Sequence, residues 1–358
     1  MSHRVIQWAT GNVGKYALRA IIGHHDLELA GVFTYNPEKH GVDAGDLLGV
    51  APVGVRATTD LDFILGLDAD CVIYAPLVLN LNEVCQILES GKNLISIPGL
   101  LYPPTLGEKV VNQLEAACRH GNSTVHGTGI NPGWVGEVLP LTMSGLCQEI
   151  EQVHVKEIGD WSHYQSSEMV FELFRFGSKI EDVALKKNAF LRSIGAYFRE
   201  SIEMVAAGLE VNLDDFTIEQ EIAIAPETYE MAAGVIPEGS VAGQRYKFTG
   251  WASAKPVIVI ETVWAVVPGL PGDWPEKGEA RWITTLEGHP SFRCEFTPAL
   301  SFNAERADAK DDAGEMSLLG TAMHAIHAVR HVCEAEPGIR TFLDLPLITA
   351  AGAMRQAN

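Results

Sequence analysis

Two adjacent side chains near the middle of the sequence, His163 and Tyr164, have the chemistry to pass a proton to a reacting nitrogen or oxygen. An imidazole titrates close to neutral pH, and a phenol can donate its O–H to the same atom. We expect both to be catalytic residues, with Trp161 lining the substrate pocket beside them. The alternative is that Trp161 and Tyr164 are core or interface aromatics and that His163 is exposed.

The N-terminus carries a turn suited to a dinucleotide. The apolar run Val5–Trp8 ends in small residues, and a helical pattern begins directly after them and stops at Gly23. Such a turn lets backbone N–H groups and the positive end of a helix approach a pyrophosphate. Ala9 stands where the G-x-G-x-x-G pattern has its first glycine, so a turn that binds nothing is the alternative. The residues expected to bind the cofactor are Thr10, Gly11, Asn12, Val13 and Gly14.

The end of the second predicted strand, Leu27–Phe33, would face the adenosine ribose. Its tip consists of Thr34, Tyr35 and Asn36, which we also expect to contact the cofactor. The tip lacks the carboxylate that binds the ribose 2′-hydroxyl of NAD, and Lys39 and His40 follow it. These residues favour NADP over NAD, with use of both left open, because a cation tolerates a 2′-phosphate. Otherwise Lys39 is a solvated loop residue.

Three more turns follow short apolar runs that we predict to be buried parallel strands. Ligands of such sheets lie beyond the carboxyl ends of the strands. The third turn, 127–134, reads G-T-G-I-N-P-G-W, and its glycines and proline hold an amide and an indole where the nicotinamide would lie. Further cofactor contacts are expected from Ala75, Pro76, Pro98, Gly99 and Asn131. Trp134 is expected in the substrate pocket.

Strands and helices alternate through the first part of the chain, which predicts an α/β fold with a doubly wound parallel Rossmann sheet. A helix is expected over 135–146, and a long amphipathic helix over about 180–209. The strands expected after it are 217–225, 244–251, 257–267 and 281–296. They predict a second, α+β domain built on a mixed or antiparallel sheet with one face free for another subunit. We place the dinucleotide-binding domain at 1–140 and the substrate and dimerisation domain at 141–314.

Composition narrows the class of protein. The 358 residues include 26 Lys and Arg against 46 Asp and Glu, a formal net charge of −20, which disfavours nucleic acid and anionic membranes as partners. Six cysteines without a C-x-x-C motif or close pair suggest reduced thiols rather than disulfides or a zinc site. No signal peptide is apparent, and no apolar run reaches the ~20 residues of a membrane span. We expect a cytoplasmic protein that acts on a small molecule.

Four motifs together resemble the dihydrodipicolinate reductase-like superfamily, and within it the 2,4-diaminopentanoate dehydrogenase and native amine dehydrogenase group. They are the turn 9–14, the Ala75-Pro76 strand end, Gly91-Lys92-Asn93 and the turn 127–134. Pro337-Gly338-Ile339 and Asp344–Leu347 extend the likeness over most of the chain. The resemblance implies that 315–358 completes the Rossmann domain, that the second sheet makes a homodimer, and that NAD(P) serves chemistry at a C–N bond. It also implies that His327 falls where relatives have a polar pocket residue.

Two departures from the relatives concern the reaction. Amine dehydrogenases of this group have a glutamate just after the strand equivalent to 93–97, and this chain has Pro98-Gly99-Leu100-Leu101-Tyr102 there. Dihydrodipicolinate reductases have a His-His pair and a lysine near the start of the second domain. Here that region reads Asp160-Trp161-Ser162-His163-Tyr164, with no lysine before Lys179. Neither departure touches the hydride-transfer scaffold.

Three histidines, His324, His327 and His331, lie three and four residues apart in a predicted helix over about 317–334 and share one face. A metal site would need further fixed ligands, and only Ala, Ile, Val and Arg lie between them, so we expect no metal. A hydrogen-bonded structural role is the alternative to pocket lining for His327.

These features predict an NAD(P)H-dependent oxidoreductase that reduces a small imine or ketone, or oxidises the corresponding amine or alcohol. The alternative is a non-catalytic dinucleotide-binding module that serves as a sensor or an assembly partner.

Overall fold

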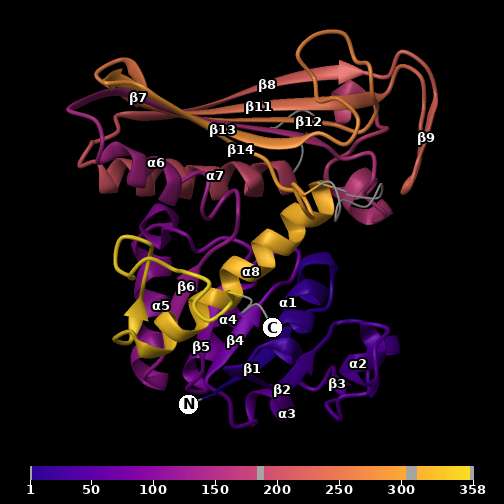
Figure 1. The fold of residues 1–358 in the computed structure, drawn as a ribbon, viewed down its shortest axis with the longest axis vertical. Coiled ribbons are helices and arrows are strands. Elements are labelled where there is room, and N and C mark those ends of the chain that lie inside the picture. The colour runs from indigo at the N-terminus through magenta and orange to yellow at the C-terminus, as the bar shows by residue number, and fades with distance from the viewer. Residues whose placement is uncertain (1, 184–188, 304–312, 355–358) are drawn as a thin grey trace. The chain divides into compact units, whose positions relative to one another are not determined.

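The computed structural model describes residues 2–183, 189–303 and 313–354. The chain forms two compact units, each with its own sheet (Figure 1). One unit comprises Met1–Gly133 and Leu318–Asn358, and the other comprises Trp134–Ser317. In the described part of the chain, every helix is too short or too polar to cross a bilayer.

The first unit is a Rossmann fold. Its sheet, as far as the chain is described, has seven strands in the order β15-β6-β5-β4-β1-β2-β3, and all neighbours pair in parallel. The strands are β1 His3–Trp8, β2 Leu27–Phe33, β3 Ala57–Thr58, β4 Cys71–Tyr74, β5 Asn93–Ser96, β6 Thr124–Gly127 and β15 Gly338–Ile339. The helices are α1 Asn12–Gly23, α2 Ala44–Leu47, α3 Leu61–Leu65, α4 Leu81–Glu89, α5 Glu108–Gly121 and α8 Ala313–Glu334, with 3-10 turns at Pro37–Lys39 and Pro103–Leu106. The order in which successive strands are added to the sheet reverses between β1 and β4, and ligands of doubly wound sheets bind at such a point.

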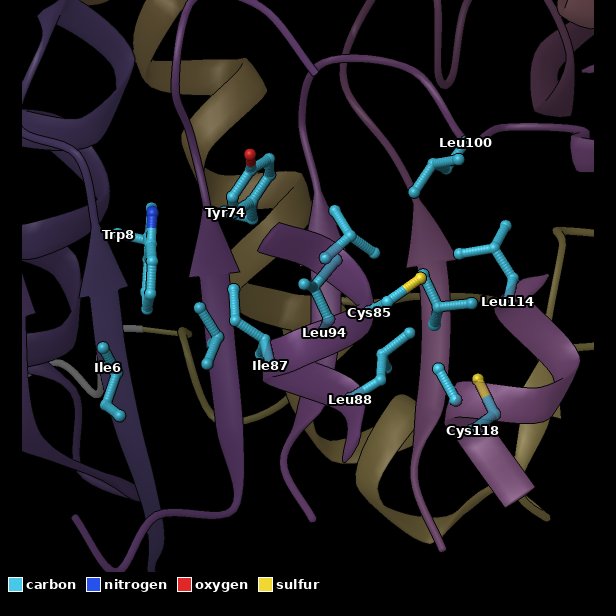
Figure 2. Packing of buried hydrophobic residues seen from close by; sticks show 14 of the residues in the cluster. Ile6, Trp8, Tyr74, Cys85, Ile87, Leu88, Leu94, Leu100, Leu114 and Cys118 are labelled. Atoms are coloured by element: carbon cyan, nitrogen blue, oxygen red, sulfur yellow. The ribbon is translucent and has the colours of Figure 1, made fainter. Parts of the chain in front are cut away.

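Each face of the Rossmann sheet has its own core. On one face, Trp8 and Tyr74 pack with Leu88 of α4 and Leu114 of α5 (Figure 2). On the other face, Val5 and Ile73 pack with α1 and with buried residues of α8; those of α8 are Ala322, Ala325, Ile326, Ala328, Val329 and Val332. Burial on both faces explains why these strands read as continuous apolar runs in the sequence.

The second unit is built on a six-stranded sheet in the order β14-β13-β7-β12-β11-β8, counted over the described residues. Only β7 and β12 pair in parallel, so the sheet is mixed and the predicted α/β plus α+β fold class is confirmed. The strands are β7 Glu149–Asp160, β8 Asp215–Ile224, β11 Val241–Ala252, β12 Lys255–Ala265, β13 Ala280–His289 and β14 Phe292–Phe296, and a hairpin is formed by β9 Tyr229–Met231 and β10 Gly234–Ile236. α6 Val138–Ser144 and α7 Ala189–Gly208 pack against one face of the sheet (Figure 1). A π-helical turn spans Glu168–Leu173, and a 3-10 turn spans Ile180–Asp182.

Several predicted elements have other bounds. The helix expected over 180–209 is a 3-10 turn and then α7, and 184–188 lie outside the described residues. The helix expected from 135 begins at Val138, which keeps Pro140 in its first turn, where a missing N–H costs no helical hydrogen bond. The strand expected over 281–296 is the β13–β14 hairpin, with Pro290 in the turn between the two strands.

Candidate active site

The turn after β1 is held in an unusual backbone conformation. Ala9 has φ of 69°, in the left-handed region that favours glycine. The buried Gln7 amide donates a hydrogen bond to the Ala9 carbonyl oxygen at 2.8 Å and so stabilises this conformation. A Cβ on Gly14 would lie 2.3 Å from the same oxygen. Gly14 is therefore needed for close packing of the turn, and Ala9 adopts the conformation expected of the first glycine.

The N-terminus of α1 is open to an anion. Gly11 is the N-cap residue and no side chain caps the helix. The first turn of α1 holds no acidic residue, so the positive end of the helix is not neutralised by its own side chains. A Cβ on Gly11 would meet no atom within 4 Å. Thr10 and Asn12 flank this opening, whereas the Val13 side chain packs against the core, which leaves its backbone for binding.

The tip of β2 carries a tyrosine with a fixed hydroxyl. Tyr35 Oη accepts a hydrogen bond from Trp8 Nε1 at 3.1 Å and donates one to Glu83 Oε2 at 2.5 Å. Tyr74 donates to the same carboxylate oxygen at 2.6 Å. Burial, then the Glu83 carboxylate, raises the pKa of both phenols. No local pattern in the sequence indicates Glu83 as a partner of Tyr35, because β3, α3 and β4 lie between them in the chain.

Lys39 reaches back to the turn between β1 and α1, residues 9–14, which the sequence predicts to bind a pyrophosphate and which we call the phosphate turn. Its Nζ donates to Thr10 Oγ1 at 2.9 Å and to the Thr10 carbonyl oxygen at 3.2 Å. Burial, and to a lesser extent the nearby charge of Lys15, lowers the pKa of Lys39. Two lysines therefore lie near the turn, and Lys39 is more than a solvated loop residue.

The other residues around the β2 tip have mainly structural contacts. The buried Thr34 bonds through its N–H to the Thr58 carbonyl, and the Asn36 side chain accepts from Glu38 N–H. The His40 ring accepts the Thr59 N–H at 3.1 Å. These contacts shape the loop that presents Tyr35 and Lys39.

The turns after β4, β5 and β6 form a row along the carboxyl edge of the sheet. Ala75 N–H donates to the Trp8 carbonyl, Ile97 N–H to the Tyr74 carbonyl and Thr128 N–H to the Ser96 carbonyl. The turn after β5 holds Pro98 and Gly99, and Leu100 beyond them is 1% exposed. A Cβ on Gly127 would lie 2.2 Å from the Leu100 carbonyl carbon. The backbone at Leu100 thus packs directly against Gly127, and the Leu100 side chain is buried. This apolar segment is the one in which the family resemblance implies a glutamate.

The turn 127–133 folds back on itself. Asn131 precedes a cis proline, and a Cβ on Gly133 would lie 2.1 Å from the backbone nitrogen of Gly129. Thr128 Oγ1 lies 2.7 Å from His324 Nδ1. His324 of α8 therefore supports this turn.

The predicted pocket residue His327 lies in the first unit, on α8. Its ring centroid is 6.3 Å from that of His24, which follows α1. Burial and His24 lower the pKa of His327, which keeps its imidazole neutral. Among the described residues, no three His, Cys, Asp or Glu side chains are grouped so that they could hold a metal ion.

The remaining predicted residues lie in the second unit, in two groups of ring contacts. Trp161 stacks on Tyr164 with ring centroids 4.6 Å apart, and His163 lies 4.9 Å from Tyr164. Trp161 also contacts Trp264 of β12 at 5.1 Å. Trp134 packs on Phe296 of β14 at 5.5 Å, which in turn lies 5.5 Å from Trp282 of β13. We call Trp134, Trp161, Tyr164, Trp264, Trp282 and Phe296 the aromatic wall.

A parallel sheet with an open helix N-terminus at its switch point, joined to a second unit with an aromatic wall, defines a Rossmann-type oxidoreductase. Residues 134–358 match the model of the 2,4-diaminopentanoate dehydrogenase C-terminal domain family. This match covers more than half of the chain. The chain therefore belongs to the 2,4-diaminopentanoate dehydrogenase and amine dehydrogenase group, and the resemblance stated above is confirmed.

Comparisons with individual relatives support the same family assignment. An amine dehydrogenase of Streptomyces virginiae is 30% identical over 98% of both chains. The 2,4-diaminopentanoate dehydrogenase of Acetoanaerobium sticklandii is 22% identical over 74% of this chain and 70% of its own. The solved amine dehydrogenase of Mycobacterium smegmatis superposes with a TM-score of 0.78 at 18% identity, over 98% of this chain and 97% of the other. The chain is thus an amine dehydrogenase-like, NAD(P)-dependent oxidoreductase.

Proposed function

We propose that this enzyme interconverts a small, partly apolar amine and the corresponding ketone through the imine. The observation that carries the proposal is the pairing, in one chain, of an open phosphate turn with a wall of aromatic side chains. When bound, the nicotinamide supplies the hydride acceptor for oxidation of amine and water to ketone and ammonium, or the hydride donor for the reverse. The residues of the protein would bind and orient the substrate and supply the proton.

The cofactor side of the proposal assigns the pyrophosphate to the backbone from Thr10 to Gly14. Tyr35 and Asn36 would lie against the adenosine ribose, beyond the buried Thr34. Ala75, Pro76, Pro98 and Gly99 would line the path toward the nicotinamide, with Asn131 near the carboxamide. Each position lies at the carboxyl edge of the sheet, where such ligands bind.

We further propose that NADP is preferred to NAD. Lys39 and Lys15 are close enough for the charge of one to lower the pKa of the other, and a phosphate between them would offset that repulsion. The Glu83 carboxylate nearby accepts two tyrosine hydroxyls, which reduces its repulsion of an anion. The preference for NADP is therefore supported by Lys39 and Lys15, two cations near the phosphate turn.

On the substrate side we propose His163 and Tyr164 as the proton donors. The Tyr164 ring stacks on Trp161, and the His163 ring lies against Tyr164. Trp161 and Trp134 would enclose the apolar part of the substrate. His327, on α8 of the first unit, is proposed as a polar contact of the substrate, as the family resemblance implies. The neutral imidazole of His327 suits a hydrogen-bonding role better than an ionic one.

The test is oxidation of NADPH and of NADH over a panel of small ketones, each with and without ammonia. Ammonia-dependent turnover with NADPH is the expected result. Turnover of ketones alone would show a carbonyl reductase. Binding of either coenzyme without turnover over the whole panel would contradict the proposal and favour a dinucleotide-binding sensor.

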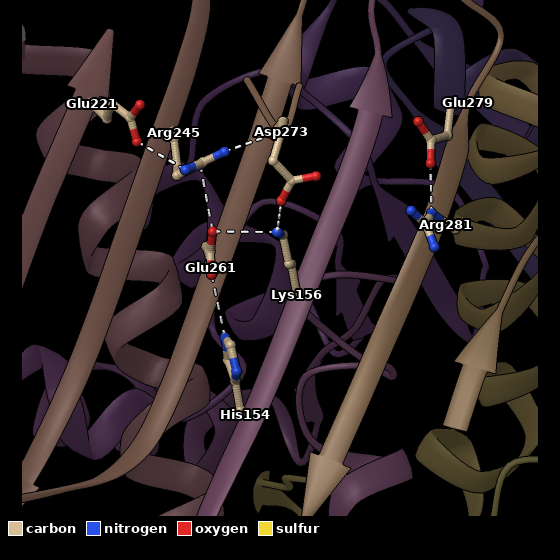
Figure 3. A network of polar contacts seen from close by, with 8 residues as sticks. All are labelled: His154, Lys156, Glu221, Arg245, Glu261, Asp273, Glu279 and Arg281. Carbon is tan, nitrogen blue, oxygen red and sulfur yellow. Dashed lines mark hydrogen bonds and ion pairs between the residues drawn. The ribbon is translucent and has the colours of Figure 1, made fainter. Parts of the chain in front are cut away.

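A homodimer through the second sheet is also proposed. The helices α6 and α7 cover one face of that sheet, and the other face carries charges of both signs (Figure 3). At its centre Glu261 faces His154, Lys156 and Arg245 at 3.4 to 3.7 Å. Burial opposes ionisation of Glu261, but these three neighbours outweigh it and lower its pKa. Light scattering on the purified protein should give twice the chain mass, and a monomer at micromolar concentration would contradict the dimer.

A cytoplasmic location is proposed from the cysteines. All six are free thiols. Cysteines are kept in this form by the reducing systems of the cytoplasm. A fusion to a fluorescent protein would test the location.

A further inference from the structure

Two thiols of the Rossmann unit meet at the core between its sheet and α8, and the proposed reaction uses neither. Cys71 is the first residue of β4, and Cys333 lies in the last turn of α8. Cys71 is fully buried, whereas Cys333 is half-buried. The Sγ atom of Cys333 lies 4.0 Å from the carbonyl oxygen of Asp70, the residue directly before Cys71.

The periods of the two elements bring these thiols to the same core. Successive side chains of a strand point to opposite faces, and Cys71 and Ile73 of β4 both point to the face that α8 covers. On α8, Val329 is buried in that core and Cys333 follows it by four residues, so both lie on the helix face toward the sheet. The two cysteines are therefore packed against one another from distant parts of the sequence.

The two thiols differ in their access to solvent. Burial, and then the hydrogen bond and charge of Cys333, raise the pKa of the Cys71 thiol. Cys71 therefore stays protonated and is shielded from reagents in solution, while its sulfur is in contact with that of Cys333. An oxidant that diffuses to the protein would meet the half-buried Cys333 first.

We propose that Cys71 and Cys333 are a redox-active pair, which hydrogen peroxide oxidises to a disulfide in the folded enzyme. The Cys333 thiolate attacks a peroxide oxygen; an S–O bond forms, the O–O bond breaks, and the leaving hydroxide takes up a proton to give water. The Cys71 sulfur then attacks the Cys333 sulfur; the S–S bond forms, the S–O bond breaks, and hydroxide leaves as water with the Cys71 proton. The two thiols give up two electrons, and one peroxide is reduced to two waters.

The disulfide would join the two chain segments of the Rossmann unit, 1–133 and 318–358. A cross-link between residues so far apart in the chain restricts the unfolded state and so stabilises the fold. Cys71 lies at the amino end of β4, at the opposite edge of the sheet from the phosphate turn. The inference therefore does not depend on the proposed function, and coenzyme affinity should be the same in both redox states.

Peptide mapping of the full-length protein tests the pair. The native protein is treated with hydrogen peroxide, the remaining thiols are alkylated in denaturant, and the chain is digested with trypsin and a protease that cleaves after glutamate. Cleavage after Glu83 separates Cys71 from Cys85. Mass spectrometry should find the Cys71 and Cys333 peptides joined, two hydrogens lighter than their sum. Oxidation of Cys333 without a joined peptide would overturn the inference.

Variants show whether Cys71 reacts only through its partner. In Cys333→Ser, Cys71 should remain a thiol after the same peroxide treatment. Cys294→Ser is the matched control, because Cys294 is also half-buried but lies on β14 of the second unit. This control should form the cross-link as wild type does. Oxidation of Cys71 in Cys333→Ser to the wild-type extent would overturn the inference.

A thermal melt shows whether the bond fits the folded protein. Oxidised wild type should unfold at a Tm about 5 °C above that of the reduced protein, and dithiothreitol should reverse the rise. Cys333→Ser should show no rise. A cross-link that forms only when peroxide is added in guanidinium, or one that lowers Tm, would overturn the inference, because the two thiols would then not meet in the folded protein.

Discussion

The carbonyl oxygen of Ala9 lies 2.3 Å from the point where a Cβ would stand on Gly14. The same oxygen accepts the Gln7 amide at 2.8 Å. The turn between β1 and α1 is therefore closely packed around the Ala9 carbonyl group. Its backbone conformation requires that residue 14 has no Cβ. Gly14 is therefore needed for packing, whereas Gly11 has open space at its Cβ position and is the glycine proposed to face the pyrophosphate.

Gly14→Ala is expected to destabilise the protein by about 1–3 kcal/mol, because the added methyl group collides with backbone that cannot move aside freely. Thermal or guanidinium unfolding measures the change. Gly23→Ala at the other end of α1 is the matched control, since a Cβ there meets no atom within 4 Å. A Gly14→Ala protein as stable as the control would contradict the close contact.

Gly11→Val should leave the stability of the fold unchanged and weaken binding of the cofactor. Position 11 has extended backbone, with φ of −74° and ψ of −164°, and open space around its Cβ, so the fold should tolerate valine. The branched side chain would instead occupy the space that a pyrophosphate needs at the helix N-terminus. Calorimetric titration with NADPH should show at least about a tenfold loss of affinity. Wild-type affinity in a folded Gly11→Val protein would remove the cofactor site from this turn.

Lys39→Met should distinguish the two coenzymes. The substitution keeps most of the aliphatic side chain and removes the ammonium group that lies 2.9 Å from Thr10 Oγ1. We expect KM for NADPH to rise by about tenfold with little change for NADH, because only NADPH carries the 2′-phosphate. Lys109→Met, at an exposed position of α5, is the control. An equal effect on both coenzymes would assign Lys39 to the pyrophosphate instead.

The Rossmann half could be predicted from the sequence because its signals are local. A parallel strand buried on both faces is a short apolar run, and the turn after it must hold small residues, as at Ala9, Gly11 and Gly14. From the sequence, Lys39 could be anticipated only as a cation near the turn and not as a hydrogen-bond partner of Thr10. Its actual contact depends on how the 3-10 turn at 37–39 folds back, which no spacing in the sequence specifies.

The second unit could be predicted only in part, because its contacts depend on strand register. Trp161, His163 and Tyr164 are neighbours in sequence, so their grouping followed from position. Glu157 is brought to Trp264 and Trp282 across 107 and 125 residues. A shift of one residue in either pairing would turn one of the tryptophans to the other face of the sheet, so the alternation along each strand could not reveal this group.

Acid should weaken the packing of the C-terminal segment on the Rossmann unit. Burial dominates the environment of His126: its Nδ1 lies 2.7 Å from the Arg340 carbonyl oxygen, and its ring meets Phe342 edge-on. The ring centroid of His324 lies 5.5 Å from that of Phe342. Burial lowers the pKa of each imidazole from 6.5 to about 4.

Because the folded pKa lies below the unfolded one, the unfolded chain takes up protons first as the pH falls. The stability contributed by the neutral rings is therefore complete above about pH 6.5 and is lost toward pH 4, by about 2 kcal/mol per histidine at pH 5. Guanidinium unfolding at pH 7 and pH 5 measures the loss, and this window lies above the range where most carboxylates titrate. His324→Gln should reduce the loss of stability between pH 7 and pH 5 by about 2 kcal/mol, the contribution of one such histidine. An identical pH dependence in wild type and His324→Gln would show that His324 does not titrate on unfolding.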